Sequence, residues 1–385
     1  MISSWSFPTK ISFGPGAIRQ IADAARGLNV RRPLVVTDPG LVKCGLLDHL
    51  TDPLAKAGLA WTLFDKVEGN PTESSVFPGI DSYHAEHCDG IIAMGGGSAI
   101  DAAKAIRLKT THSLPLEEYD DLKNGGDRIS ANIPSMIAIA TTAGTGSEVG
   151  RSTVIGLKST GRKTVIFSPY LIPNLAIEDP ELTLGVPPHI TAATGMDAMT
   201  HNLEAYLSKG YHPMCDAIAL RGVAMVQNHL RTAVHDGRNL AARTEMLAAS
   251  MMGAVAFQKG LGSVHSLAHP LSTVAGMHHG LTNAILLPHV MRFNLPVVSQ
   301  RLADLAAALG VDTRGLAPEE AANAAIAAIE TLNTEIGIPK RLRDAGVREE
   351  MIPVMVPKAM EDGCHLLNPR STTREDMEAL YRAAL

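Results

Sequence analysis

Residues 89–106 read DGIIAMGGGSAIDAAKAI, and this stretch decides the fold of the first half of the chain. Its apolar run at 89–94 has the length of a buried strand, glycines fill the turn that follows, and a helical pattern begins after Ser98. The segments 33–37 and 135–140 have the same apolar, β-branched texture and are also followed by turn residues. This alternation predicts parallel strands connected by crossover helices.

The composition and the apolar periodicity of the sequence change after Asp179-Pro180. Beyond that point the chain is rich in Ala, Leu, Met and Glu, and apolar residues recur with the 3.6-residue period of a helix. We expect helices over 191–207, 214–230, 240–257 and 319–336. A chain of this length is also expected to form two domains. The sequence therefore predicts an α/β, Rossmann-like nucleotide-binding domain at 1–180 and an all-helical domain at 181–385.

Composition and charge exclude several classes of protein. The 385 residues carry a formal charge of −5, which gives no electrostatic signal for nucleic acid or an anionic membrane. No run approaches the roughly 20 apolar residues needed to cross a bilayer, and the first residues lack the pattern of a signal peptide. The four cysteines lack CxxC spacing and are expected to be reduced thiols. We therefore expect a cytoplasmic protein without nucleic-acid or membrane partners.

Two glycine-containing loops follow predicted strands and suggest a nucleotide site. The first is Gly95-Gly96-Gly97-Ser98, and the second, at 141–148, reads TTAGTGSE. Glycines allow the backbone to approach a pyrophosphate, and the N-terminus of the next helix presents free N–H groups. Alone, the first loop is equally well explained as a tight turn with Ser98 as helix cap, and it is not the GxGxxG fingerprint. Two such loops at the carboxyl ends of strands favour a dinucleotide crevice.

Asp38 ends the first predicted strand and has two interpretations. An acid at this position can accept hydrogen bonds from the adenosine ribose and would repel a 2′-phosphate, which favours NAD over NADP. Alternatively, Asp38 caps the turn formed with Pro39-Gly40, a common use of aspartate. From the residues alone, the turn is the better explanation.

Acid and imidazole side chains recur at helical spacing in the second half. Asp197 and His201 are four residues apart, His265 and His269 are four apart, and His279 follows ten residues later. Residues four apart lie on one face of a helix, and N and O ligands from separate segments are typical of a divalent transition metal. An exposed polar face explains any single pair, but three clusters together favour a metal. Spacing alone does not identify the histidine that is not a ligand.

These residues lie in motifs that resemble the iron-dependent (group III) alcohol dehydrogenases, of the dehydroquinate synthase-like superfamily. The matching motifs are GGGSxxDxxK at 95–104, TTAGTGSEV at 141–149, GMDAMTH at 195–201, GLGSVHSLAHPL at 260–271 and HHGLTNAILLPHV at 278–290. Asn368-Pro369-Arg370 fits the C-terminal end of the family. The similarity covers essentially the whole chain, and the last three long motifs are highly specific together.

The resemblance implies specific roles for the candidate residues. Asp197, His201, His265 and His279 would hold the metal, expected to be Fe²⁺ with Zn²⁺ as an alternative occupant of a purified sample. His269 would relay a proton near the nicotinamide, and His278 would either lie behind the ligands or line the pocket. The implied NAD contacts are Asp38, Asn70, Gly96, Gly97, Ser98, Asp101, Thr141, Thr142, Thr145, Ser147 and Lys163. The implied substrate-pocket residues are Ser152, Phe257 and Cys364.

The expected function is an NAD-dependent alcohol dehydrogenase or aldehyde reductase acting on a small substrate. The metal would polarise the substrate oxygen, while neutral imidazole ligands leave its positive charge largely uncancelled. A glycerol-type dehydrogenase or a maleylacetate reductase is the nearest alternative within the superfamily. A metal-binding module without turnover is the alternative from another class, and the two glycine loops argue against it. The resemblance further leads us to expect a homodimer or larger homo-oligomer.

Overall fold

The computed structural model describes residues 7, 9–159 and 161–385, except for the side chain of Arg162, and it divides into two compact units. The nucleotide unit comprises Phe7–Thr142 and Gly146–Leu184. The helical unit comprises Ala143–Thr145 and Gly185–Leu385. Three residues of the second glycine loop thus pack with the helical unit, although both flanking segments belong to the nucleotide unit.

A parallel six-stranded sheet forms the centre of the nucleotide unit, with strand order β1-β8-β5-β4-β2-β3. Its strands are β1 (Lys10–Phe13), β2 (Pro33–Val36), β3 (Thr62–Phe64), β4 (Gly90–Gly95), β5 (Ser135–Ala140) and β8 (Leu175–Glu178). The helices of this unit are α1 (Ile21–Gly27), α2 (Pro39–Lys43), α3 (Asp48–Lys56), α4 (Glu73–Ala85) and α5 (Gly97–Lys109). The predicted strands at 33–37, 89–94 and 135–140 are confirmed as β2, β4 and β5.

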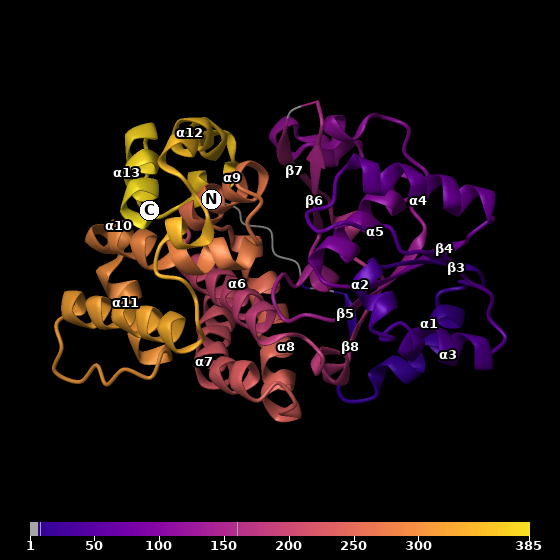
Figure 1. Ribbon diagram of the computed structural model, residues 1–385, viewed down its shortest axis with the longest axis horizontal. Helices are drawn as coiled ribbons and strands as arrows, with labels where there is room; N and C mark the ends of the chain where they lie inside the picture. The colour runs from indigo at the N-terminus through magenta and orange to yellow at the C-terminus, as the bar shows by residue number, and fades with distance from the viewer. Residues whose placement is uncertain (1–6, 8, 160) are drawn as a thin grey trace. The chain divides into compact units, whose positions relative to one another are not determined.

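Helices cover both faces of the sheet. Ile91 and Ile92 are adjacent in β4 and both are fully buried, because successive side chains of a strand point to opposite faces. Ile91 joins a core that includes residues of α4 and α5, and Ile92 joins one that includes residues of α1 and α3. Figure 1 shows these two helix pairs on opposite sides of the labelled strands. Burial on both faces explains the continuous apolar runs in the sequence.

An antiparallel hairpin interrupts the strand–helix alternation and was not expected from the sequence. It consists of β6 (Ser152–Leu157) and β7 (Arg162–Phe167), which pair with each other outside the main sheet. Only a short turn separates the two strands, so a crossover helix cannot fit between them and the pairing must be antiparallel. The hairpin packs on α5, where the Thr153 hydroxyl donates to the backbone oxygen of Asp101 at 2.7 Å.

The second half of the chain is helical, as predicted. Its helices are α6 (Pro188–Leu207), α7 (Pro213–His235), α8 (Leu240–Ala256), α9 (Ser263–Val274), α10 (His279–Ala308), α11 (Pro318–Glu335), α12 (Ile352–Glu361) and α13 (Arg374–Ala384). Helix α6 is buried along nearly its whole length because α7, α8 and α10 pack around it. A helix in that position can present polar side chains only to an internal site.

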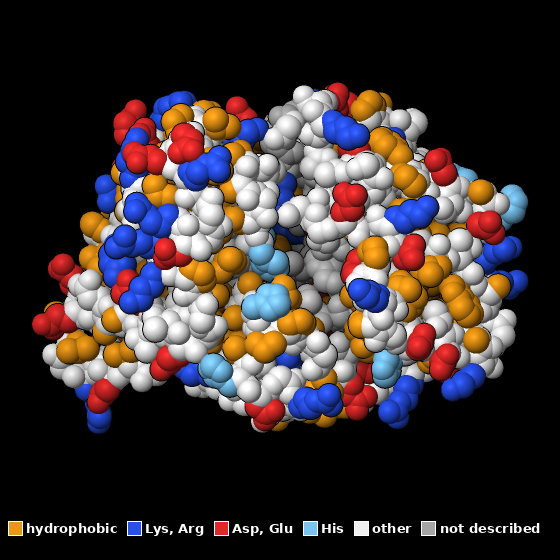
Figure 2. All heavy atoms as spheres, in the orientation of Figure 1, with side chains coloured by type: hydrophobic (Ala, Val, Ile, Leu, Met, Phe, Trp, Pro, Cys, Tyr) orange, Lys and Arg blue, Asp and Glu red, His pale blue; other side chains and the backbone are white. Residues whose placement is uncertain are grey.

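On the visible face of each unit, acidic and basic side chains are interspersed (Figure 2). Among the described residues, the structure contains no helix whose length and apolar character would let it cross a membrane.

A cluster of buried charged groups lies beneath the second glycine loop. The Lys104 ammonium donates to the backbone oxygens of Ser147, Gly150 and Ser152 at 2.6–2.8 Å. Burial lowers the pKa of Lys104 to about 8, against the opposing effect of Asp101 and Glu148. Burial also raises the pKa of Glu148 to about 7. Burial, and to a smaller extent the charge of Glu148, raises the pKa of Glu178 well above its usual value.

The raised pKa of Glu148 predicts a pH-dependent stability. The folded protein binds this proton more tightly than the unfolded chain, so the stability it contributes is present below about pH 4.5 and is lost as the pH rises through about 7. Glu148→Gln mimics the neutral acid and should flatten this decline, gaining about 1–3 kcal/mol over the parent protein at pH 8. Urea denaturation at a series of pH values measures the effect, with the exposed Glu68→Gln as control. Identical pH profiles for Glu148→Gln and the parent would contradict the assignment.

Candidate metal centre and nucleotide loops

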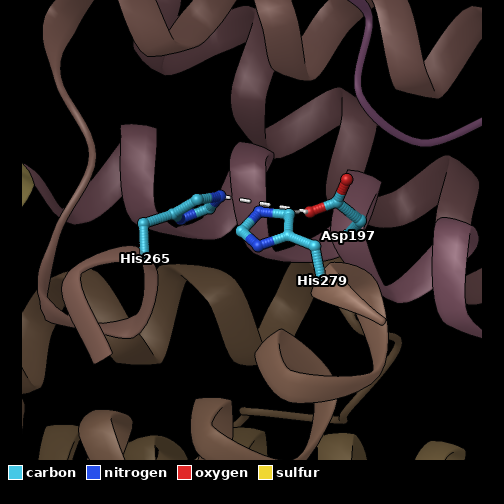
Figure 3. A group of neighbouring side chains, drawn as sticks. All are labelled: Asp197, His265 and His279. Carbon is cyan, nitrogen blue, oxygen red and sulfur yellow. Dashed lines mark ion pairs between the residues drawn. The ribbon is translucent and has the colours of Figure 1, made fainter. Parts of the chain in front are cut away.

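Three side chains from three helices converge inside the helical unit. Asp197 lies on α6, His265 in the first turn of α9, and His279 at the start of α10. Their ligand atoms all lie within 4.8 Å of one another (Figure 3). Asp197 Oδ1 is 4.0 Å from His265 Nε2 and 3.6 Å from His279 Nε2. Asp197 and His265 are each 2% exposed, so the carboxylate and the imidazole are almost entirely removed from water and need polar partners within the protein.

His201 extends the group on the same face of α6 as Asp197. Its Nε2 lies 3.8 Å from Asp197 Oδ1, and its ring stacks on that of His265 with centroids 4.8 Å apart. Its Nδ1 lies 3.2 Å from the backbone oxygen of Gly144. Burial lowers the pKa of His201, although Asp197 opposes the shift. A neutral imidazole that donates through Nδ1 leaves the Nε2 lone pair for a cation.

The spacing and chemistry of Asp197, His265 and His279 fit a divalent metal ion, and His201 offers a fourth donor 3.8 Å from Asp197 Oδ1. Ligands at bond lengths near 2.1 Å in a tetrahedral arrangement lie about 3.4 Å apart. The distances from Asp197 Oδ1 to the three Nε2 atoms are 3.6–4.0 Å, so a small contraction brings them to that value. One carboxylate and three imidazoles suit iron or zinc better than magnesium or calcium, which prefer all-oxygen sites.

The side-chain amide of Asn283 lies close to three of the proposed ligand atoms. Its Nδ2 donates to Asp197 Oδ1 at 2.7 Å and lies 3.2 Å from His279 Nε2 and 3.4 Å from His265 Nε2. A group that carries partial positive charge therefore faces three ligand atoms at once. The same convergence of lone pairs would favour a cation.

Glu204 fixes the orientation of His265. Its Oε2 accepts from His265 Nδ1 at 2.6 Å, and its Oε1 accepts from the backbone N–H of Val264 at 2.7 Å. Burial disfavours protonation of His265, but the hydrogen bond and charge of Glu204 outweigh it and raise the pKa of the imidazole. Such a carboxylate directs Nε2 toward the metal position and makes the ring a stronger ligand.

His269 has a carboxylate partner of its own. Its Nδ1 lies 2.7 Å from Asp362 Oδ2, while Asp362 Oδ1 accepts from the Ser266 hydroxyl at 2.7 Å. Burial opposes ionisation of Asp362, yet its interactions with His269 and Ser266 hold its pKa well below the usual value. The His269 ring stacks on His279 with centroids 5.2 Å apart. His269 thus lies beside the ligand group with its Nδ1 engaged by Asp362.

Glycine at 280 is required by the packing of α10 on α6. A Cβ atom at Gly280 would lie 2.2 Å from the backbone oxygen of Ala193, a distance that real side chains do not reach. Any other residue would push the start of α10, and with it His279, away from Asp197. This contact explains the glycine that follows the histidine pair in the sequence.

The predicted cofactor residues lie around two adjoining loops of the nucleotide unit. A Cβ at Gly96 would lie 3.2 Å from Thr142 Oγ1, so the two glycine loops touch. Gly97 and Ser98 form the first turn of α5, and the backbone N–H of Asn70 donates to Ser98 Oγ at 3.3 Å. Asn70 has a left-handed backbone with φ of 56° and accepts from Lys163 Nζ at 2.8 Å. Asn70, Ser98 and Lys163 therefore form one connected group.

The remaining predicted cofactor residues bond within the same loops. The Ser147 hydroxyl donates to Asp101 Oδ1 at 2.6 Å, and burial raises the pKa of Asp101. Thr141 is buried, and its backbone N–H donates to the Gly95 oxygen at 3.0 Å. Thr145 is half-buried and packs with the helical unit. These contacts give Asp101 and Thr141 structural roles that hold the loops in place.

The structure confirms the turn interpretation of Asp38, while its contact with the cofactor stays a prediction. Its Oδ1 accepts from the backbone N–H groups of Gly40 and Leu41 at 2.8 and 3.1 Å, so it caps α2. Its Oδ2 lies 3.6 Å from the position that a Cβ at Gly95 would occupy. One carboxylate oxygen therefore serves the cap while the other faces the first glycine loop.

The predicted pocket residues fall in both units. Ser152 begins β6 of the nucleotide unit. In the helical unit, the Phe257 ring meets the His201 ring edge-on, with ring centroids 5.1 Å apart. The backbone N–H of Cys364 donates to Asp362 Oδ1 at 2.9 Å. His278 is an exposed residue that immediately precedes α10. Phe257 and Cys364 thus lie beside residues of the ligand group and of the His269 pair.

Sequence reasoning missed Glu204, Asp362 and Asn283. Glu204 could have been found, because Asp197, His201 and Glu204 follow one face of α6 at positions i, i+4 and i+7. Asn283 likewise lies four residues after His279 on α10. Asp362 is 93 residues from His269, and no spacing rule connects them.

Comparisons with known proteins identify the family of the chain. Residues 8–180 match the family model described as iron-containing alcohol dehydrogenase, and residues 191–385 match that of the C-terminal part of the same family. The chain is 41% identical to 1,3-propanediol dehydrogenase of Citrobacter freundii, covering 97% of this chain and 96% of the relative. It is 39% identical to lactaldehyde reductase of Escherichia coli K12, covering 97% of both chains.

Two solved structures share the fold of this chain over nearly its whole length. A 1,3-propanediol oxidoreductase superposes with a TM-score of 0.96 at 40% identity, covering 100% of both chains. Sulfoacetaldehyde reductase from Bifidobacterium kashiwanohense in complex with NAD⁺ superposes with a TM-score of 0.88 at 30% identity, covering 100% of this chain and 99% of that one.

The two hydrogen bonds of Glu204 predict the effect of Glu204→Gln. A glutamine cannot accept from both the Val264 N–H and His265 Nδ1, because one of its two side-chain heavy atoms is a donor. An amide donor facing Nδ1 places the imidazole proton on Nε2 and removes the ligand lone pair. Zn²⁺ affinity, measured by competition with a chelating dye, should fall about 10–100-fold. Unchanged affinity in a folded Glu204→Gln protein would show that His265 does not depend on Glu204.

Proposed function

This chain belongs to the iron-containing alcohol dehydrogenase family, and we propose that it transfers a hydride between NAD(H) and a small alcohol or aldehyde at the ligand group around Asp197. The chain is accordingly an oxidoreductase. The single observation that carries the assignment of the site is the convergence of Asp197 Oδ1 with three imidazole Nε2 atoms at 3.6–4.0 Å.

We assign Asp197, His201, His265 and His279 as the residues that hold the metal. Fe²⁺ is the expected ion, and Zn²⁺ is the alternative in a purified sample. When bound, the divalent ion supplies positive charge that polarises the oxygen of the substrate. A single carboxylate among the four ligands leaves a net positive charge in a site from which water is largely excluded. Phe257, packed on His201, forms an apolar wall beside these residues.

We assign proton transfer to His269. Asp362 engages Nδ1 at 2.7 Å, which leaves Nε2 as the nitrogen that can take up or release a proton. An alcohol must lose its hydroxyl proton before a carbonyl forms, and a carboxylate partner stabilises the imidazolium that results. Cys364 lies next to this pair and is proposed, with Ser152 and Phe257, to line the substrate pocket.

The two glycine loops are proposed to bind the cofactor. Gly96, Gly97 and Ser98 lie at the N-terminus of α5, where backbone N–H groups favour the negative charge of a pyrophosphate. The connected group of Asn70, Ser98 and Lys163 adds a cationic side chain beside that helix end. Thr141, Thr142, Thr145, Ser147 and Asp101 are proposed to line the second loop.

Steady-state kinetics before and after chelation test the proposed function. The protein should form NADH from short alcohols such as 1,3-propanediol, and the reverse reaction should consume NADH with lactaldehyde. Complete metal removal should lower kcat/KM by roughly 100-fold or more, and Fe²⁺ or Zn²⁺ should restore it. Activity undiminished in the metal-free protein would exclude the proposed site, and glycerol or maleylacetate as the far better substrate would favour the alternative dehydrogenases.

The two oxygens of Asp38 predict a change in cofactor preference. Asp38→Asn keeps an oxygen that can cap α2 but removes the negative charge beside the first glycine loop. The ratio of kcat/KM for NADP⁺ over NAD⁺ should rise by at least roughly 10-fold, because repulsion of the 2′-phosphate is relieved. The exposed Asp52→Asn variant is the control. An unchanged ratio would remove Asp38 from the cofactor site.

We also propose a homodimer or larger homo-oligomer in the cytoplasm. The outer strand β1 exposes Ile11 and Phe13, which supports contact with a second copy. The four cysteines carry thiols rather than disulfides, which supports a reducing compartment.

A further inference from the structure

Gly144 lies at the centre of the second glycine loop and contacts a proposed metal ligand. Ala143–Thr145 pack with the helical unit, whereas Thr142 and Gly146 on either side belong to the nucleotide unit. The backbone oxygen of Gly144 lies 3.2 Å from His201 Nδ1, and both residues are buried. A carbonyl can only accept, so this contact selects the tautomer of His201 that carries its proton on Nδ1.

The loop is held against α6 at a second point. A Cβ at Gly144 would lie 2.8 Å from Thr194 Cβ and 3.0 Å from the Thr194 backbone oxygen. The Thr194 hydroxyl donates to Ile190 O at 2.9 Å, which fixes that side chain on its own helix. Thr194 and His201 are seven residues apart and lie on the same face of α6. Gly144 therefore packs against Thr194 and contacts His201, and a residue with a side chain does not fit at this position.

The residues on either side of Gly144 are those proposed to bind NAD(H). Thr142 touches the first glycine loop at Gly96, and Ser147 bonds to Asp101 of α5. Gly146 has a left-handed backbone with φ of 61°, and Lys104 holds the next residue through its backbone oxygen at 2.6 Å. A loop held so tightly cannot adjust to a cofactor at Thr142 without moving the carbonyl two residues away.

We propose that Gly144 couples the cofactor loop to the metal ligand His201, so that NAD(H) strengthens metal binding and the metal strengthens NAD(H) binding. The coupling rests on the proposed function, since it requires both ligands. A cofactor that contacts the loop at Thr142 would favour the position in which the Gly144 carbonyl accepts from His201 Nδ1, and the metal would hold His201 where it donates to that carbonyl. Linkage requires the two effects to be equal in magnitude.

Binding titrations on the purified full-length chain test the coupling. Zn²⁺ affinity is measured by dye competition with and without saturating NAD⁺, and NAD⁺ affinity is measured with and without Zn²⁺. Each ligand should increase the affinity of the other by the same factor, about 5-fold or more. A factor of one in the parent protein, with both ligands bound, would overturn the coupling and leave the proposed function intact. Failure to bind either ligand would contradict the proposed function itself.

A matched pair of glycine variants separates the loop from direct contact between the ligands. Gly144→Ala places a methyl group against Thr194 and should weaken Zn²⁺ binding and bring the coupling factor close to one. A Cβ at Gly150, later in the same segment, would lie no closer than 3.5 Å to any atom. Gly150→Ala should therefore keep the coupling factor of the parent protein. A full coupling factor in folded Gly144→Ala would overturn the role of this residue.

A measurement on the parent protein covers the case in which Gly144→Ala does not fold. In the Zn²⁺-loaded protein, nitrogen-15 NMR of the histidine side chains should show His201 with its proton on Nδ1, assigned by the loss of its signal in His201→Gln. Addition of NAD⁺ should shift the Nδ1–H resonance of His201 as its hydrogen bond to Gly144 changes. A proton on Nε2, or a resonance that NAD⁺ does not move, would overturn the proposal.

Discussion

The constraint on which the helical unit depends is the burial of the Asp197 carboxylate. A buried charge is tolerated only when hydrogen bonds or opposite charge compensate for the lost water. Here the compensation is the Asn283 amide at 2.7 Å and an array of imidazoles from three helices. Helices α6, α9 and α10 therefore serve two purposes, since they contribute to the apolar core and they carry the groups that compensate the burial of Asp197.

Three imidazoles of the site are each held by a separate acceptor. Glu204 engages His265, the Gly144 carbonyl engages His201, and Asp362 engages His269. A carboxylate strengthens the imidazole it contacts more than a carbonyl does, so chemically identical side chains acquire different basicities. His265 and His269 both have a carboxylate partner, so their proposed roles as ligand and proton carrier follow from position: His265 Nε2 lies 4.0 Å from Asp197 Oδ1, whereas His269 lies beside the ligand group.

Much of the fold could be predicted, because the period and length of the apolar runs distinguish strands from helices. The buried strands at 33–36, 90–95 and 135–140 are apolar on both faces, and the helices of the second half follow a clear period. The hairpin at 152–167 could not be predicted by the same rule, because its short turn replaces the expected helix. Equally, no local pattern indicates that Ala143–Thr145 pack with a different unit from their neighbours.

The proposed ligands and their outer partners differ in how visible they are in a sequence. Asp197 and His201 lie on one helix, so their spacing is informative. Asp362 reaches His269 only through tertiary packing, and the Gly144 contact uses a backbone atom that any residue type possesses. Side-chain chemistry can be read from a sequence, whereas backbone acceptors become visible only in three dimensions.

The distribution of the ligand group over α6, α9 and α10 also bears on the order of events during synthesis. Helices α7, α8 and α9 separate Asp197 from His279 along the chain, so the group does not exist until α10 has packed on α6. A partly folded or truncated chain carries only the pair on α6, which is too few donors to retain an ion against cellular chelators. Metal loading would then follow folding, and ion content would report which molecules have completed it.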